Sequence, residues 1–246
     1  MASNYFEVFS RIWESVSSQW EDRGPTPTFL QDFIDDLYKH SVIRIEDVIL
    51  VVVLGVAFTI ARYATTTFIF KPLSVYFQFI TKDRQKFPES AWKLLYYICS
   101  YLYCCYILFS GKYPFMENPE SVWIGIKVEI KFGWNIGIEV PYDIYVLYAI
   151  QVGFYFHSIY GTVFMDIWRR DSVVMILHHV LTLCLLVFSI SIRYHNIGVI
   201  VLFLHDIADI FLEFTKICVC FKSRPGAEHR VANALVNVGF LSFAFV

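Results

Sequence analysis

The sequence predicts an all-α polytopic membrane protein, a helix bundle with about six spans, on the strength of three observations. Hydrophobic residues make up 57% of the 246 residues and the mean hydropathy is +0.53, which is too apolar for an ordinary soluble domain. The apolar residues gather in blocks of about 20, the length of a helix that crosses a bilayer. Basic residues concentrate between alternate blocks, as they do in the cytosolic loops of membrane proteins.

The N-terminal segment is predicted to contain a short amphipathic helix. Such a helix can lie flat on a bilayer surface or pack against the bundle, and the sequence leaves both interpretations open. Its apolar face is made by residues at spacings of three and four, namely Phe6, Phe9, Trp13, Val16 and Trp20.

Five apolar blocks and the beginning of a sixth follow along the chain. The sixth is still apolar at Val246 and has no polar flank, so we expect the chain to be a fragment that ends inside a span. The first block also carries an interior charge, Arg62. The predicted spans are 46–68, 91–110, 142–166, 172–192, 197–219 and a last one from residue 231.

These blocks divide the chain into a luminal segment (1–45), a first transmembrane span (46–70), a short basic cytosolic linker (71–90) and a core (91–246). Inside the core, the alternating pattern VEIKFGWNIGIEV in the loop 111–140 predicts a small hairpin.

The orientation follows from the basic loops. They come after the first, third and fifth predicted spans, in the linker 71–90, at Arg169 and Arg170, and in KSRPGAEHR at 222–230. The positive-inside rule places these loops in the cytosol and the N-terminus on the other side, which we take to be the lumen of the endoplasmic reticulum.

The fifth predicted span contains HDIADIFLEFTK at 205–216, with five ionisable side chains in twelve residues. At 100° per residue these side chains fall within about 100° of arc on one helix face. An Asp or Lys at the bilayer centre costs roughly 2.5–3.5 kcal/mol, so this face must turn toward protein or water and away from lipid. The residues are His205, Asp206, Asp209, Glu213 and Lys216.

Two other predicted spans repeat this feature. In 172–192, polar residues lie within about 40° of one another, with His179 about 100° from His178. We expect the three polar faces to meet at one site that opens toward the cytosolic half of the membrane. The third span contributes Gln151, Tyr155, Ser158, Thr162 and Asp166, and the fourth contributes Asp171, His178, Thr182 and Ser189.

Several functions are compatible with histidines and carboxylates at such a site. They can bind a metal, although the chain has only seven histidines where membrane di-iron enzymes use repeated His boxes. They can form a proton path in a transporter, although no inverted repeat is evident. Glu213 and Lys216, at i and i+3, can simply be a buried ion pair that fixes helix packing.

Acyl transfer is a further interpretation. An imidazole oriented by a carboxylate can deprotonate an amine or hydroxyl, or can attack a thioester to give an acyl-imidazole. Two adjacent histidines, His178 and His179, facing the His205–Asp206 pair would supply the base and the orienting group.

HHVLT at 178–182 followed by HDIADIFLEFTK resembles the Lag1 motif of the ceramide synthases, HHxxT and then HDxxDxxLExxK. Every position of the motif is matched, and the flanking stretches WRRDSVVMILHH, SIRYHN and PESAWK are also similar to that family. The resemblance runs from about residue 71 to the end, and it implies a TLC-type bundle whose TLC domain core is 91–246.

The resemblance implies an acyltransferase of the endoplasmic reticulum that joins a fatty acyl-CoA to the amine of sphinganine or another sphingoid base and releases CoA. His178 and His179 are then the catalytic pair, one as acyl carrier and the other as base. His205 polarises the same site, and Asp206 or Asp209 orients a histidine. Further residues are expected to bind substrate: Arg169, Arg170, Thr182, Tyr155, Ser158, Glu213 and Lys216.

Substrate and partner expectations follow from the same resemblance. The linker 71–90 is too short for the homeobox-like domain that many relatives carry, so the chain is most similar to the homeobox-free type, which favours stearoyl-CoA. We expect no cofactor, no metal and no nucleic-acid partner, and we expect membrane lipid as a partner, with a homo- or heterodimer left open. The alternative is a non-enzymatic membrane protein of the same fold that binds lipid or assists translocation.

Overall fold

The computed structural model describes residues 43–123, 128–129, 134–135, 139–169, 172–223 and 236–237. The predicted N-terminal amphipathic helix lies outside these residues, as do Arg170, Asp171 and almost all of the predicted sixth span.

Long helices occupy the segments that the sequence predicts as the first five spans. The first helix continues, through two further short helical elements, to Tyr76, beyond the predicted end. The second begins at Thr81, ten residues before the predicted position. These helices are α3 (Ile45–Thr65), α5 (Thr81–Phe109), α6 (Tyr142–Phe164), α7 (Ser172–Ser191) and α8 (His195–Lys222).

By length and composition, three of the described helical segments could cross a membrane, namely Ile45–Tyr76, Thr81–Phe109 and Ser172–Ser191. The predicted count of six spans is therefore not confirmed. α6 and α8 are outside this set, and they are the helices that carry most of the polar residues of the site described below.

The predicted linker 71–90 is mostly helical, which corrects the expectation of a loop. α3 continues through a π-helical turn, η1 (Thr66–Phe70), into α4 (Lys71–Tyr76), and α5 begins only a few residues later. The chain reverses at Gln78, which has a left-handed backbone with φ of 55°. An aromatic cluster holds this turn, with Phe79 buried and its ring centroid 5.0 Å from that of Phe221 in α8.

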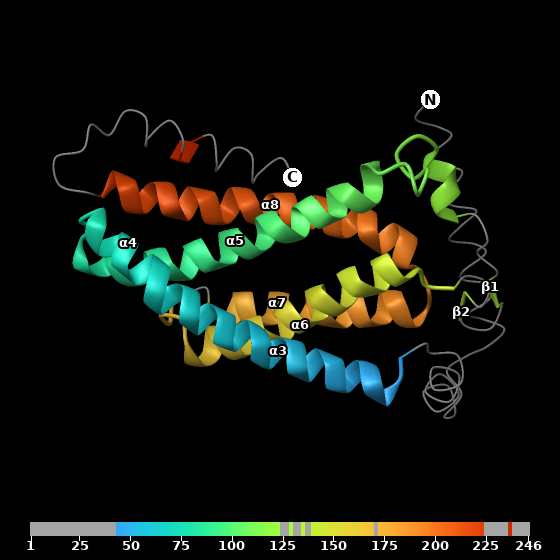
Figure 1. The fold of residues 1–246 in the computed structure, drawn as a ribbon, viewed down its shortest axis with the longest axis horizontal. Coiled ribbons are helices and arrows are strands. Elements are labelled where there is room, and N and C mark those ends of the chain that lie inside the picture. The colour runs from blue at the N-terminus through green and yellow to red at the C-terminus, as the bar shows by residue number, and fades with distance from the viewer. Residues whose placement is uncertain are drawn as a thin grey trace, which may run out of the picture. The chain divides into compact units, whose positions relative to one another are not determined.

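The helices pack in pairs: α5 lies along α8, α3 along α6, and α6 along α7 (Figure 1). The contact between α3 and α6 is close because it is made at glycines. A Cβ on Gly153 would lie 2.7 Å from the Cβ of Leu54, and a Cβ on Gly55 would lie 2.6 Å from the ring of Phe156. Small residues at such crossings let membrane helices approach closely.

The loop after α5 contains a short 3₁₀ helix, η2 (Pro119–Trp123), and the predicted hairpin. The hairpin consists of β1 (Val128–Glu129) paired antiparallel with β2 (Trp134–Asn135), with Val128 opposite Asn135. The expectation of a small hairpin in 111–140 is thus confirmed, and it does not change the all-α class.

Candidate functional site

Two histidines from different helices form the centre of the candidate site. The rings of His178 in α7 and His205 in α8 are stacked, with centroids 5.4 Å apart and planes 9° from parallel. His179, the next residue of α7, has its ring centroid 5.6 Å from that of His178. Helical geometry turns His178 toward α8, while His179 turns about 100° further, toward α6.

Tyr155 of α6 contacts both His205 of α8 and His179 of α7. Its hydroxyl lies 3.3 Å from Nδ1 of His205, and its ring centroid lies 5.7 Å from that of His179. Tyr155 is completely buried. The structure therefore brings together polar residues from the third, fourth and fifth predicted spans, as the helical pattern of each span predicts.

His205 has two carboxylates beside the same ring nitrogen. Its Nδ1 lies 3.4 Å from Oδ2 of Asp209, one helical turn further along α8, and 3.9 Å from Oδ1 of Asp206. A carboxylate next to Nδ1 fixes the ring orientation and favours a proton on that nitrogen, which leaves Nε2 as the basic nitrogen. Asp209 is therefore the better-placed partner of His205.

Asp206 is held by a buried network that links α5, α6 and α8. Its Oδ2 accepts hydrogen bonds from the Ser100 hydroxyl at 2.6 Å and from the Gln151 amide at 2.9 Å. The Gln151 carbonyl oxygen in turn accepts from the Tyr96 hydroxyl at 3.0 Å. Asp206 and Gln151 are completely buried, so the network fixes the carboxylate on one side and leaves Oδ1 facing His205.

Ser100 and Tyr96 are functional neighbours that the sequence interpretation missed. They lie on α5, whose YYICSYLYCC pattern is typical of an aromatic membrane helix and contains no charged residue. The one sequence signal on this helix face is the spacing of Tyr96 and Ser100, which are four residues apart and so place two hydroxyl groups on the same side of the helix.

His179 is the most enclosed of the histidines at the site. Its exposed fraction is 2%, and neither ring nitrogen has a hydrogen-bond partner among the residues that the structure describes. Buried polar atoms are nearly always hydrogen-bonded in folded proteins, so an unpaired imidazole next to another histidine is typical of a group that contacts a substrate.

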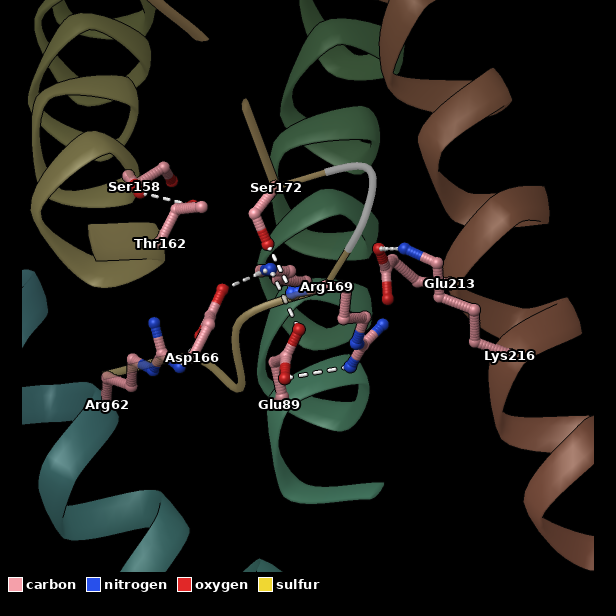
Figure 2. Close-up of polar contacts among 10 residues, drawn as sticks. Arg62, Glu89, Ser158, Thr162, Asp166, Arg169, Ser172, Glu213 and Lys216 are labelled. Carbon is pink, nitrogen blue, oxygen red and sulfur yellow. Dashed lines mark hydrogen bonds and ion pairs between the residues drawn. The ribbon is translucent and has the colours of Figure 1, made fainter. Parts of the chain in front are cut away.

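A network of buried charges lies further along the same helices (Figure 2). Asp166, which follows α6, pairs with Arg62 of α3 and, at 2.8 Å, with Lys93 of α5. Glu89 of α5 lies 3.5 Å from Lys93 and 3.0 Å from Arg169. The interior charge of the first span is thus neutralised by the polar face of the third, and Arg169 is held by Glu89.

The remaining predicted site residues are placed as follows. The Thr182 hydroxyl donates to the carbonyl of His178 at 2.9 Å, within its own helix, and Ser158 is buried. Glu213 and Lys216 form an ion pair of 2.6 Å, as expected for structural residues at i and i+3 (Figure 2). Arg170 lies outside the described residues.

The arrangement permits two kinds of chemistry. The ligand atoms of His178, His205 and Asp209 all lie within 4.8 Å of one another, close enough to hold one metal ion. The same three groups, with His179 and Tyr155, also form a nucleophile-and-base arrangement in which a carboxylate orients one imidazole beside another.

Comparison with known proteins decides which family this arrangement belongs to. The model of the TLC domain matches residues 86–246. Ceramide synthase 1 from Mus musculus is 42% identical over 242 residues, and ceramide synthase 1 from Homo sapiens is 45% identical over the same length; each alignment covers 98% of this chain and 66% of the relative.

A plant relative shows the same relationship at greater distance. Ceramide synthase LOH1 from Arabidopsis thaliana is 30% identical over 206 residues, which cover 77% of this chain and 62% of that protein. The residues matched by the TLC domain model, 86–246, include the Lag1-like residues of α7 and α8. The chain therefore belongs to the TLC domain family and, within it, to the ceramide synthases.

Proposed function

We propose that the full-length protein is an acyltransferase of the endoplasmic reticulum membrane that transfers a fatty acyl group from acyl-CoA to the amine of sphinganine or another sphingoid base. The names of the relatives support ceramide synthesis in general. Similarity to the two ceramide synthase 1 proteins over 98% of the chain supports the homeobox-free type and, with it, a preference for stearoyl-CoA.

The observation that carries the proposal is the stacked pair His178 and His205, with Asp209 beside His205. His179 lies beside His178, and its ring nitrogens have no hydrogen-bond partner among the described residues. One imidazole of the adjacent pair His178 and His179 can act as nucleophile while the other acts as base. His205, polarised by Asp209 and bonded to Tyr155, is placed to stabilise charge at the same point.

The reaction proceeds in two balanced steps. In the first, a ring nitrogen attacks the thioester carbonyl, an acyl–nitrogen bond forms, the carbon–sulfur bond breaks, and the imidazole proton passes to the departing CoA sulfur. In the second, the amine of the sphingoid base attacks the acyl carbon, the amide bond forms and the acyl–imidazole bond breaks, while the proton lost by the amine returns to the imidazole.

The membrane setting defines the remaining features of the proposal. The N-terminus is luminal and the site opens toward the cytosolic side, where water-soluble acyl-CoA is available, while the sphingoid base arrives from the lipid phase. Membrane lipid is a direct neighbour of the apolar helix faces, and a homo- or heterodimer is compatible with them.

The test is an assay of the full-length protein in microsomes of cells that lack other ceramide synthases, with sphinganine and acyl-CoAs of graded chain length. His178→Ala, His179→Ala and Asp206→Asn are each expected to lose activity. Ser191→Ala is the matched control, because the Ser191 hydroxyl donates to the carbonyl of Val187 in its own helix. Wild-type activity in the three variants, at equal protein level, would show that the site is assigned wrongly.

A metal centre is the second candidate, because the ligand atoms of His178, His205 and Asp209 lie within 4.8 Å of one another. On this alternative, a chelator abolishes activity and a divalent metal restores it, whereas the acyl-imidazole proposal expects activity to survive chelation. If no acyl-CoA of any length gives product with an intact protein, the non-enzymatic alternative replaces both.

A further inference from the structure

A second site lies beside the charge network, at a cavity of about 720 Å³ between the end of α3, the turn η1, α4, the first turns of α5 and the segment after α6. Its volume is in the range of cavities that hold cofactor-sized ligands. The cavity is lined by residues that the candidate catalytic site does not use, among them Thr66, Thr67, Lys71, Ser74 and Arg84.

The charge of this cavity is positive and only partly compensated. Among its charged lining residues, Arg62 is neutralised by Asp166, and Glu89 is neutralised by Lys93 and Arg169. Lys71 and Arg84 are exposed, and within the described part of the chain no carboxylate forms a salt bridge with either of them. The two uncompensated cations therefore attract an anion into the cavity.

The hydroxyl groups on the same wall fit the oxygens of a phosphate. Thr66 and Thr67 belong to η1, a π-helical turn of a kind that is rare and is found frequently at functional sites. Lys71 follows on α4, and Arg84 comes from α5. The Ser74 hydroxyl on the same wall already donates to the carbonyl of Lys71 at 2.7 Å. Lysine, arginine and hydroxyl side chains that converge from three elements are suited to the oxygens of a phosphate ester.

We propose that this cavity, at Lys71 and Arg84, binds the phosphate groups of the nucleotide end of acyl-CoA. This inference rests on the proposed function and adds the place where the co-substrate is anchored. Along α6, Tyr155 contacts the histidines and Met165 lines the cavity, and these ten residues of helix correspond to roughly 15 Å. The extended pantetheine arm of CoA has a comparable reach, so the thioester can lie at the histidines while the phosphates remain in the cavity.

The kinetic test uses the full-length protein with Lys71→Gln, Arg84→Gln and the double variant. Because both side chains are exposed, the variants are expected to fold, and Lys82→Gln on the same first turn of α5 is the matched control, since Lys82 is exposed and does not line the cavity. The double variant is expected to raise KM for stearoyl-CoA by about tenfold, with kcat and the KM for sphinganine within about twofold of wild type.

A binding test separates this inference from the proposed function, because it needs no turnover. Adenosine 3′,5′-bisphosphate, which carries the phosphates of the nucleotide end without the thiol arm, is titrated into purified wild type and the double variant. We expect the double variant to bind about tenfold more weakly than wild type and Lys82→Gln to bind normally. Equal binding by all three proteins overturns the inference, even if ceramide is made.

An anionic lipid headgroup shares the phosphate chemistry, so the kinetics are repeated in nanodiscs with and without phosphatidylserine. The inference expects the same rise in KM in both membranes. A defect of the double variant that is seen only with phosphatidylserine assigns the cavity to a lipid and overturns the inference. Bisphosphate binding that is lost in the double variant, in a protein without transferase activity, supports the inference and counts against the proposed reaction.

Discussion

The side-chain amide of Gln151 donates a hydrogen bond of 2.9 Å to the carboxylate of Asp206, and this bond ties α6 to α8 beside the histidine pair. The same amide donates to Ser100 at 2.6 Å, so one side chain connects three helices. Because all three residues are buried, the network sets the position of Asp206 in a region where water cannot replace a lost partner.

The first prediction concerns this network. Gln151→Leu removes the amide donor, and within the described part of the chain it leaves the Ser100 hydroxyl as the one hydrogen-bond donor to the Asp206 carboxylate. A hydrogen bond to a charged group contributes about 1.5–3 kcal/mol, so kcat is expected to fall about ten- to a hundredfold. Steady-state kinetics of the full-length protein measure this effect.

The control for that prediction is chosen on the same helix. Thr162→Val removes a hydroxyl that donates only to the carbonyl of Ser158, so it is expected to leave kcat within about twofold of wild type. Ser100→Ala should lower kcat as Gln151→Leu does, and Ser100→Thr, which keeps the hydroxyl, should recover part of it. An equal loss in Thr162→Val would mean that the effect is one of general packing.

The second prediction concerns Asp166, which neutralises two buried cations. Asp166→Asn leaves Arg62 and Lys93 without their shared carboxylate, and breaking a buried ion pair costs about 3–5 kcal/mol of unfolding free energy. We expect a clearly lower midpoint of thermal unfolding in detergent. Adding Arg62→Met to this variant should recover part of the loss, because it removes the cation left without a carboxylate, whereas Lys93 keeps Glu89.

An exposed ion pair provides the comparison. Lys112 pairs with Asp143 at 2.8 Å, but the Lys112 side chain is 59% exposed. Lys112→Gln is therefore expected to leave the unfolding midpoint unchanged, since the lysine is solvated and the Tyr113 hydroxyl and the Ile144 amide still donate to the remaining carboxylate. If Lys112→Gln lowers the midpoint as much as Asp166→Asn does, burial is not the cause of the larger effect.

Features that depend on local pattern could be predicted from the sequence. The bounds of α7 and α8 agree with the predicted spans to within a few residues, because hydropathy and helical periodicity are properties of contiguous segments. The three polar faces also meet as predicted, since a helix presents His205 and Asp209 on one side whatever surrounds it.

Features that depend on which helices are neighbours could not be predicted. Arg62 and Asp166 are 104 residues apart in sequence, and nothing in the sequence around either residue indicates that they form an ion pair. The hydroxyl of Thr182 lies on the predicted face, yet its rotamer turns it to the carbonyl of His178 within its own helix. The helical structure of the linker 71–90 could not be predicted, because its many charged residues are typical of a solvent-exposed loop. The burial of Phe79 and Phe87 depends on contacts with other helices.

The third prediction concerns the close approach of α3 and α6. A Cβ on Gly153 would meet the Cβ of Leu54 at 2.7 Å, and neither atom can move without a shift of the helix backbone. Gly153→Ala is expected to lower the unfolding free energy by about 1–3 kcal/mol. Gly55→Ala should cost less, because its Cβ would meet the ring of Phe156, whose side chain is 42% exposed and can rotate away.

Thermal unfolding of the two glycine variants, side by side in the same detergent, measures this difference. The rank order is the informative result, because alanine itself favours the helix over glycine at both positions. A midpoint for Gly153→Ala at or above that of Gly55→Ala would show that the two helices do not approach as closely as their glycines indicate.

The fourth prediction concerns Gln78, which turns the chain between α4 and α5 with a φ of 55°. The amide of Phe79 donates to the carbonyl of Ser74 at 3.3 Å, which is the hydrogen bond of a Schellman motif, the helix C-cap with one residue in the left-handed conformation. Glycine adopts this conformation without the clash that a Cβ creates, so Gln78→Gly is expected to stabilise the protein by about 0.5–1 kcal/mol.

Gln85→Gly is the opposite control. Gln85 is exposed and lies within the helix α5, where glycine is a poor helix former, so this variant should destabilise the protein by about 1 kcal/mol. A shift of the unfolding midpoint upward for Gln78→Gly and downward for Gln85→Gly is the expected result, and a decrease in both would contradict a left-handed turn at residue 78.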